Sequence, residues 1–134
     1  MKTVLILLVG NLGPMDDKKM IEFVKRGDVT VVSFNEASIY GVSDVDQVNE
    51  ELRRFVTHEK PKKMIVDFSG VKFVSSQMLG LLVDLWRKMT EYGGIVLISG
   101  IVPQLNRVFR ITNLDKIFDF YPDAESALKT LGQD

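Results

Sequence analysis

Apolar and polar positions alternate along the chain with a spacing that changes from segment to segment, and each spacing predicts an element. Residues 21–27 (IEFVKRG) and 29–35 (VTVVSFN) are short runs that are rich in β-branched and aromatic residues. The turn-forming pair Gly27-Asp28 separates them. The two runs are therefore predicted to form a β-hairpin.

The next segment has helical spacing. Apolar residues recur on one helix face at Val45, Val48, Leu52, Phe55 and Val56. The spacing Ser43-x-x-Asp46 is that of a capping box, and Asp44 adds a second acidic residue that favours the positive end of a helix. The pattern predicts a helix that begins after Ser43 and ends near His58.

The second half of the chain alternates short apolar runs with amphipathic stretches. The apolar runs predict buried strands at 64–68, 95–99 and 117–121. Helical patterns cover 76–92, the stretch from Pro103 to about Asn113, and the stretch after the capping residue Asp123. Strands that alternate with helices predict an α/β domain, in which helices pack on a largely parallel or mixed sheet of four or five strands.

The stretch FVSSQMLG (73–80) places two serines directly before the helix predicted at 76–92. Ser75 or Ser76 is expected to be the N-cap of that helix. A helix N-terminus also favours an anion, so phosphorylation of one of these serines is the functional alternative to a purely structural role. Met78 is either a core residue or an exposed, adaptable contact, and the helix face that it shares with Leu82 and Trp86 favours the core.

Composition narrows the function classes. The chain has 134 residues, no cysteine, one histidine (His58) and a net charge of −1. These values exclude disulfides and thiolate chemistry, disfavour a multi-histidine metal site, and provide no electrostatic footprint for nucleic acid. Asp67 ends a predicted strand, but the first strand lacks the acidic pair that a phospho-accepting aspartate needs for its metal. We therefore expect Asp67 to be a loop or hydrogen-bonding residue, and we expect neither an enzyme nor a bound cofactor.

Residues 1–20 differ from the rest of the chain. VLILLVG follows Met1-Lys2 and resembles the start of a secretory signal, but no small-residue cleavage site follows it. An accessory strand or ordered leader is the first interpretation, and a signal peptide is the second. No run of roughly 18 apolar residues is present, so no membrane span is predicted.

Residues 21–131 resemble the STAS domain family (sulfate transporter and anti-sigma factor antagonist). The resemblance is carried by KKMIVDFSGVKFVSSQMLG, LLVDLWRKMTEYGG and IVLISGIVPQLNRVFRITNLDKIFDFYPDAESAL. They follow the family's order of a strand ending in D-L/F-S-G-V, a D-S-S-G-L-G loop, a helix to Gly-Gly, and a further strand, helix and short strand. The resemblance implies the STAS fold for residues 21–134, with about four helices on a mixed sheet. Residues 1–20 then form an N-terminal extension.

The resemblance implies a bacterial, cytoplasmic regulator. Stand-alone members of the family bind an anti-sigma factor that is also a serine kinase, and this binding frees the sigma factor. The kinase phosphorylates a serine in the D-S-S-G-L-G loop, which abolishes binding, and a phosphatase reverses the modification. A constitutive scaffold or sensor module is the alternative function, and a small-ligand or nucleotide-binding module ranks last because no phosphate loop is present.

The chain departs from the family pattern in the serine loop. Alignment on Leu79-Gly80 and the apolar residues before the serines places the usual phosphoacceptor on Gln77, which cannot be phosphorylated. Ser76 is then the first candidate phosphoacceptor and Ser75 the second. The partner surface is expected at Ser76, Gln77 and Met78, together with the 36–46 loop that contains Ser43 and Asp44.

Overall fold

The computed structural model describes residues 19–133. In chain order the elements are β1 (Ile21–Arg26), β2 (Val29–Phe34), β3 (Ser38–Ile39), α1 (Val42–Glu59), β4 (Lys63–Asp67), β5 (Phe73–Val74), α2 (Ser76–Glu91), β6 (Ile95–Ser99), α3 (Pro103–Ile111), the 3₁₀ turn η1 (Leu114–Lys116), β7 (Asp119–Tyr121) and α4 (Ala124–Thr130).

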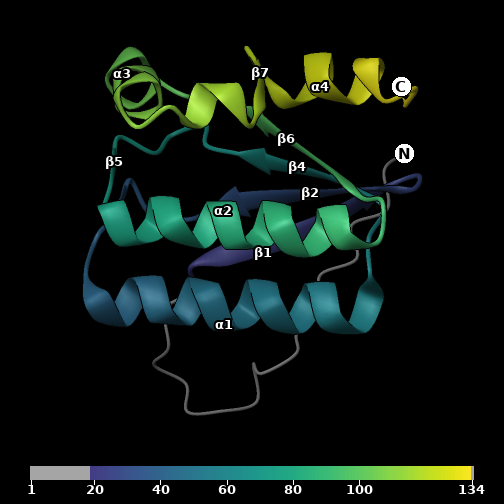
Figure 1. The fold of residues 1–134 in the computed structure, drawn as a ribbon, viewed down its shortest axis with the longest axis horizontal. Helices are drawn as coiled ribbons and strands as arrows, with labels where there is room; N and C mark the ends of the chain where they lie inside the picture. Colours follow the sequence, from purple (N-terminus) through teal and green to yellow (C-terminus); the bar gives the residue numbers. More distant parts are fainter. Residues whose placement is uncertain (1–18, 134) are drawn as a thin grey trace.

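The main sheet has the strand order β1-β2-β4-β6-β7 (Figure 1). β1 and β2 are antiparallel and form the predicted hairpin, whereas β2, β4, β6 and β7 are parallel neighbours. Parallel neighbours require crossover connections, which contain α1, α2 and α3. This confirms the prediction of an α/β fold with a mixed sheet of four or five strands and about four helices, since residues 19–133 form a main sheet of five strands and four α-helices.

Helices cover both faces of this sheet. α1 and α2 lie side by side over one face, and α4 packs on the other (Figure 1). The alternation of side chains along β4 explains the two cores. Met64 and Val66 face α1 and α2, while Ile65 between them packs with Leu128 of α4. The apolar pattern that predicted α2 is confirmed, because the apolar face of this helix is buried. Leu82 on that face has an exposed fraction of 0%.

The start of α1 differs from the prediction. Gly41 is the N-cap, with no side-chain hydrogen bond, and the helix begins at Val42. The Gly41 carbonyl accepts a hydrogen bond from the Val45 amide at 2.9 Å. Ser43 therefore lies inside the first turn, and the capping-box prediction is wrong. The helix begins two residues earlier than a cap at Ser43 requires, so the Ser43 hydroxyl is not in the N-cap position that serves the unpaired N–H groups.

The C-terminal third follows the predicted order with one shorter strand. Asn113 ends the α3 region in the left-handed conformation, with φ 64°, as expected of a helix-closing residue. The predicted strand at 117–121 is reduced to β7, because η1 occupies residues 114–116 and the chain pairs with β6 only from Asp119 onward.

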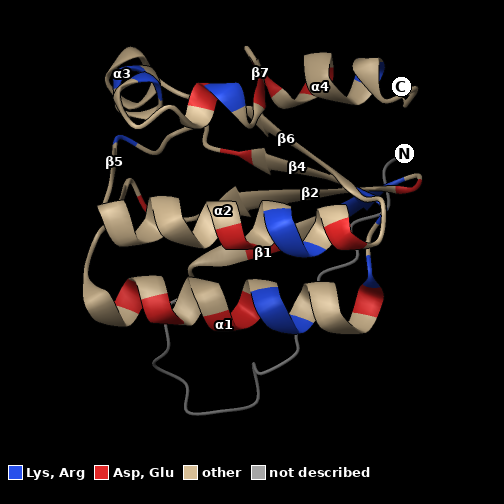
Figure 2. Cartoon of the chain, in the orientation of Figure 1, with Lys and Arg blue, Asp and Glu red and all other residues tan. Residues whose placement is uncertain are grey.

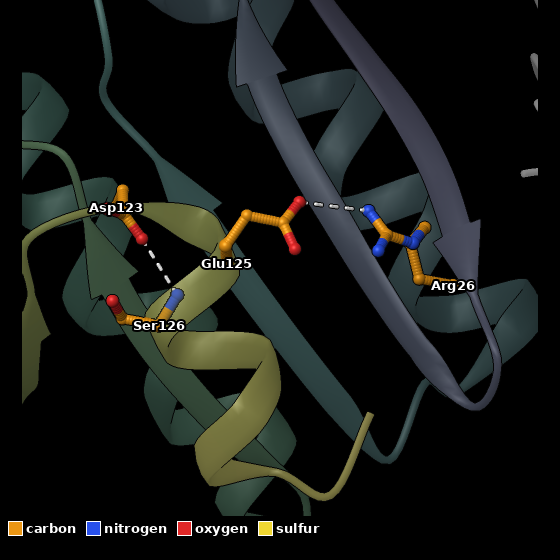
Figure 3. A network of polar contacts seen from close by, with 4 residues as sticks. All are labelled: Arg26, Asp123, Glu125 and Ser126. Atoms are coloured by element: carbon orange, nitrogen blue, oxygen red, sulfur yellow. Dashed lines mark hydrogen bonds and ion pairs between the residues drawn. The ribbon is translucent and has the colours of Figure 1, made fainter. Parts of the chain in front are cut away.

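The predicted cap of the last helix is confirmed. Asp123 Oδ1 accepts a hydrogen bond from the Ser126 amide at 2.8 Å (Figure 3). This bond to the backbone N–H lowers the pKa of the Asp123 carboxyl, because it favours the charged form. Two residues into the same turn, Glu125 Oε2 lies 3.3 Å from Arg26 Nη1, which links α4 to the end of β1 (Figure 3).

Charges of both signs are interspersed on α1 and α2 (Figure 2). His58 is exposed in the last turn of α1, as expected. The interpretation of residues 1–20 falls almost wholly outside the described residues, which begin at Lys19. Met20 belongs to the main core and has an exposed fraction of 0%.

Candidate functional site

Ser75 forms the N-cap of α2. Its Oγ accepts a hydrogen bond from the Met78 amide at 3.2 Å, and its backbone is extended. The Ser75 amide donates in turn to the Ile39 carbonyl at 3.0 Å, so the cap is held by β3 as well as by the helix. Of the two serines left open by the sequence, Ser75 is the cap.

Replacing Ser75 by alanine is expected to lower the free energy of unfolding by about 1 kcal/mol, because the Met78 amide loses its side-chain acceptor. Urea unfolding measures this difference. Ser76→Ala is the matched control and should stay within about 0.5 kcal/mol of the unmodified protein. Equal losses for the two variants would contradict the assignment of Ser75 as the cap.

Ser76 and Gln77 form the exposed first turn of α2. Their backbone N–H groups occupy the first two helical positions, where no intrahelical acceptor exists. None of the hydrogen bonds between described backbone groups uses them. Met78 is fully buried, with an exposed fraction of 0%, as its helix face predicted. Three residues of this turn were expected at the partner surface. Ser76 and Gln77 are exposed there, whereas Met78 lies in the core.

A small parallel sheet beside this turn was not predicted. Ser38 pairs with Phe73, and Ile39 pairs with Val74. Side chains alternate across a strand, so Ile39 is buried while Phe73 points to solvent with an exposed fraction of 60%. Tyr40 continues β3 on the solvent side and is 67% exposed.

These exposed apolar side chains are a candidate interaction feature that sequence reasoning missed. Val42, at the start of α1, is also 67% exposed. Tyr40, Val42 and Phe73, with the α2 residues Ser76 and Gln77, are called the α2-cap surface below. Strands of two residues have too few positions to show alternation, so the sequence carried no signal for β3 and β5.

Hydrogen bonds at the strand ends hold the loop that carries Phe73. Asp67 Oδ1 accepts from Ser69 Oγ and from Ser99 Oγ, both at 2.9 Å, which confirms its expected hydrogen-bonding role. Gly100 has a φ of +72°, and a Cβ there would lie 2.7 Å from Asp67 Oδ1. Further along the loop, the Lys72 amide donates to the Ala37 carbonyl at 2.7 Å. The loop is thus tied to β6 on one side and to the 35–37 connection on the other.

The first turns of α1 and α2 meet at a groove. It is lined by residues that include Gln77 and Gly80 of α2 and Val45 and Asp46 of α1. Asp44 is half-buried in the first turn of α1, and Ser43 is exposed. The structure therefore brings Gln77 to the beginning of α1, one residue away from the expected Asp44.

The described residues contain no group of three or more metal-ligating side chains that could hold an ion. Between residues 19 and 133, no helix combines the length and the apolar character that crossing a membrane requires. The five residues of the α2-cap surface offer hydroxyl, amide and apolar groups.

Comparison with known proteins supports the same fold. A family model described as "STAS domain" matches residues 20–127. An anti-sigma-factor antagonist (STAS) domain protein from Planctomyces limnophilus is similar, with a TM-score of 0.77 at 24% identity, over 85% of this chain and 98% of its own.

Two further solved structures resemble the chain. An anti-sigma factor antagonist from Mycobacterium paratuberculosis has a TM-score of 0.73 at 24% identity and covers 83% of this chain and 92% of its own. The Bacillus cell fate determinant SpoIIAA in its phosphorylated form has a TM-score of 0.61 at 18% identity, over 84% of this chain and 97% of its own. At these identities the likeness shows the fold.

Proposed function

Because the chain belongs to the STAS domain family, we propose that it is an anti-sigma factor antagonist-like regulator. It binds an anti-sigma factor with serine kinase activity in a bacterial partner-switching pathway, in the cytoplasm. The role is one of binding rather than catalysis, with no cofactor. The alternative is a constitutive, non-phosphorylated STAS scaffold or sensor module in a signalling complex.

The observation that carries this proposal is the α2-cap surface. Three apolar side chains are each at least 60% exposed: Tyr40, Val42 and Phe73. Covering exposed apolar side chains of this size with a partner removes them from water, which stabilises the complex. Aromatic residues are enriched at protein interfaces and at their energetic centres. The two aromatic side chains stand next to the first turn of α2, where the family resemblance placed the partner.

Ser76 is the proposed phosphoacceptor, and Ser75 is the second candidate. Ser76 is exposed, whereas the Ser75 hydroxyl accepts the Met78 amide and serves as the cap. A phosphate on Ser76 would lie close to the two unpaired N–H groups of the first α2 turn, which favours the modification locally. It would also add roughly −1.5 to −2 charges to a surface whose five defining side chains carry no charge.

Phosphate on Ser76 is expected to weaken partner binding. We expect Ser76→Asp to reduce affinity for the partner about tenfold, or about 1.4 kcal/mol, because the carboxylate must be desolvated beside Phe73. Ser76→Ala should bind nearly as the unmodified protein does. Isothermal titration with the purified partner measures both variants, and equal affinity for all three proteins would contradict a switch at Ser76.

The experiment that tests the function begins with the partner. The protein is incubated with ATP and each serine-kinase anti-sigma factor encoded in the same genome, complexes are isolated, and phosphate is mapped by mass spectrometry. Stable binding to one of them, with phosphate on Ser76, supports partner switching. Binding without phosphate on either serine leaves the constitutive scaffold, and failure to bind any of them overturns the proposal.

A further inference from the structure

The outward face of α3 combines two basic residues with an uncovered apolar one. Arg107, Arg110 and Ile111 follow the spacing i, i+3, i+4, which places them on one face of the helix. All three are exposed, and Ile111, at 73%, is the most exposed large apolar side chain among residues 19–133. The face therefore presents two guanidinium groups and an aliphatic side chain to solvent.

α3 differs in charge from the other helices of residues 19–133. α1, α2 and α4 each contain acidic and basic residues, whereas α3 contains two arginines and no acidic residue (Figure 2). On α1 and α2, arginines form ion pairs within the helix: Arg54 with Glu50 and Arg87 with Asp84. The ion pairs formed among residues 19–133 include neither Arg107 nor Arg110. Within this part of the chain, no carboxylate neutralises the two arginines of α3.

Helix stability accounts for only part of this pattern. Arg110 stands in the last turn of α3, where a cation interacts favourably with the negative end of the helix dipole. Arg107 lies in the middle of the nine-residue helix, outside that turn. The exposed side chain of Ile111 leaves apolar surface in water, which is unfavourable. Binding of another molecule explains Arg107 and Ile111, whereas the stability of α3 does not.

The inner face holds α3 in a fixed orientation. Leu105 and Phe109 are 2% and 0% exposed, and the Phe109 ring meets the Phe68 ring edge-on with centroids 6.2 Å apart. The Thr112 hydroxyl donates to the Val108 carbonyl at 2.8 Å, which closes the last turn. The outward side chains therefore project from a rigid element, so less conformational freedom is lost when a partner binds.

The chemistry of the outward face selects the kind of partner. A guanidinium group matches a carboxylate with two parallel hydrogen bonds, and Ile111 offers an apolar contact beside it. Two arginines on a chain with a net charge of −1 neutralise too few phosphates for nucleic acid. One exposed aliphatic side chain on a nine-residue helix provides too little apolar surface for a membrane. The face fits an acidic protein segment that contains an apolar residue.

The position of α3 connects this face with the α2-cap surface. α3 lies at the same end of the molecule as β5 and the start of α2 (Figure 1). The 3₁₀ turn η1, which follows α3, adds one charge of each sign, Asp115 and Lys116, so the region keeps the positive charge of the two arginines. A protein that covers the α2-cap surface can therefore also reach α3.

We propose that Arg107, Arg110 and Ile111 bind an acidic segment of the anti-sigma factor partner, while the α2-cap surface binds another part of the same protein. The inference rests on the proposed function, which supplies the partner. The two arginines attract the acidic segment during the encounter and so raise the association rate. Ile111 adds an apolar contact once the complex has formed.

Surface plasmon resonance with the anti-sigma factor that binds this protein tests the α3 face. Arg107→Glu/Arg110→Glu should lower the association rate constant about tenfold or more at low salt, and should remove most of its salt dependence. Lys62→Glu/Lys129→Glu is the matched control, since it changes the net charge equally at two exposed lysines, one directly before β4 and one on α4. It should leave the association rate constant nearly unchanged.

A second variant separates binding from folding. Arg107→Gln/Arg110→Gln removes both charges but keeps good helix formers and adds no carboxylate at the negative end of α3. It should also slow association, by less than the glutamate variant does. Circular dichroism of each variant should match that of the unmodified protein.

Four outcomes would overturn the inference. Equal association rate constants for the unmodified protein and the folded glutamine variant would overturn it and leave the proposed function intact. Equal losses in the α3 variants and the lysine control would do the same, because net charge would then explain the effect. Arginine-dependent binding to phosphatidylcholine–phosphatidylglycerol vesicles, with unchanged affinity for the protein partner, would assign the face to a membrane. Failure of every candidate anti-sigma factor to bind the unmodified protein would overturn the proposed function together with this inference.

Discussion

Replacing Phe68 by alanine is expected to lower the free energy of unfolding by about 3–5 kcal/mol. Phe68 is fully buried, with an exposed fraction of 0%. Its ring stacks on Phe34 with centroids 5.0 Å apart and meets Phe109 edge-on at 6.2 Å. Alanine would leave a cavity between the end of β4, β2 and α3, and it would remove both aromatic contacts. The lost burial of the ring and the lost packing contacts both lower the free energy of unfolding.

Urea unfolding followed by circular dichroism and by fluorescence of Trp86 measures the loss and checks that the two probes agree. Phe73→Ala is the matched control, since it removes the same side chain from an exposed position. Its effect on stability should stay within about 0.5 kcal/mol. A loss of less than about 1 kcal/mol for Phe68→Ala would contradict the tight packing of this strand end.

The second large effect concerns binding and rests on the proposed function. Phe73→Ala is expected to weaken binding to the anti-sigma factor partner about 30-fold, or about 2 kcal/mol, as for an aromatic residue at the centre of an interface. Phe73 is 60% exposed and belongs to a two-residue strand, so the folded protein has little to lose when the ring is removed. Surface plasmon resonance with the immobilised partner measures the change.

Ile95→Ala is the control for this experiment. Ile95 is an exposed apolar residue at 44%, but it is the first residue of β6 in the main sheet, whereas β5 belongs to the separate two-stranded sheet with β3. Its replacement should leave partner affinity unchanged. If Ile95→Ala and Phe73→Ala weaken binding equally, general exposure of apolar surface rather than the α2-cap surface accounts for the interaction.

Local patterns predicted the regular elements well where they were long. The face of α2 that carries Leu82 and the helix stop at Gly93-Gly94 follow from spacing and from glycine conformation, both of which act within a few residues. The cap at Asp123 was predicted for the same reason, because its acceptor oxygen meets an amide only three residues away. The start of α1 was not predicted correctly, because its N-cap, Gly41, has no capping side chain that could be recognised in the sequence.

The candidate site shows the limit of the same reasoning. Sequence spacing indicated a serine cap before α2 and a core position for Met78, and the structure confirms both. Spacing left open which serine is the cap. Ser75 is selected because its amide is already held by the Ile39 carbonyl, which leaves its hydroxyl directed at the helix and Ser76 in the exposed turn.

By itself the sequence determined the order of strands and helices, the apolar faces that build the two cores, and the resemblance to the STAS family. These depend on side-chain periodicity and turn chemistry, which are properties of neighbouring residues. Only the tertiary structure decided that Tyr40 and Phe73 share one exposed surface beside Ser76. That surface requires β3 to pair with β5 across 35 positions of sequence, since Ser38 pairs with Phe73. Such a pairing is selected by the packing of the whole sheet and its helices, and strands of two residues carry no periodicity from which it could be predicted.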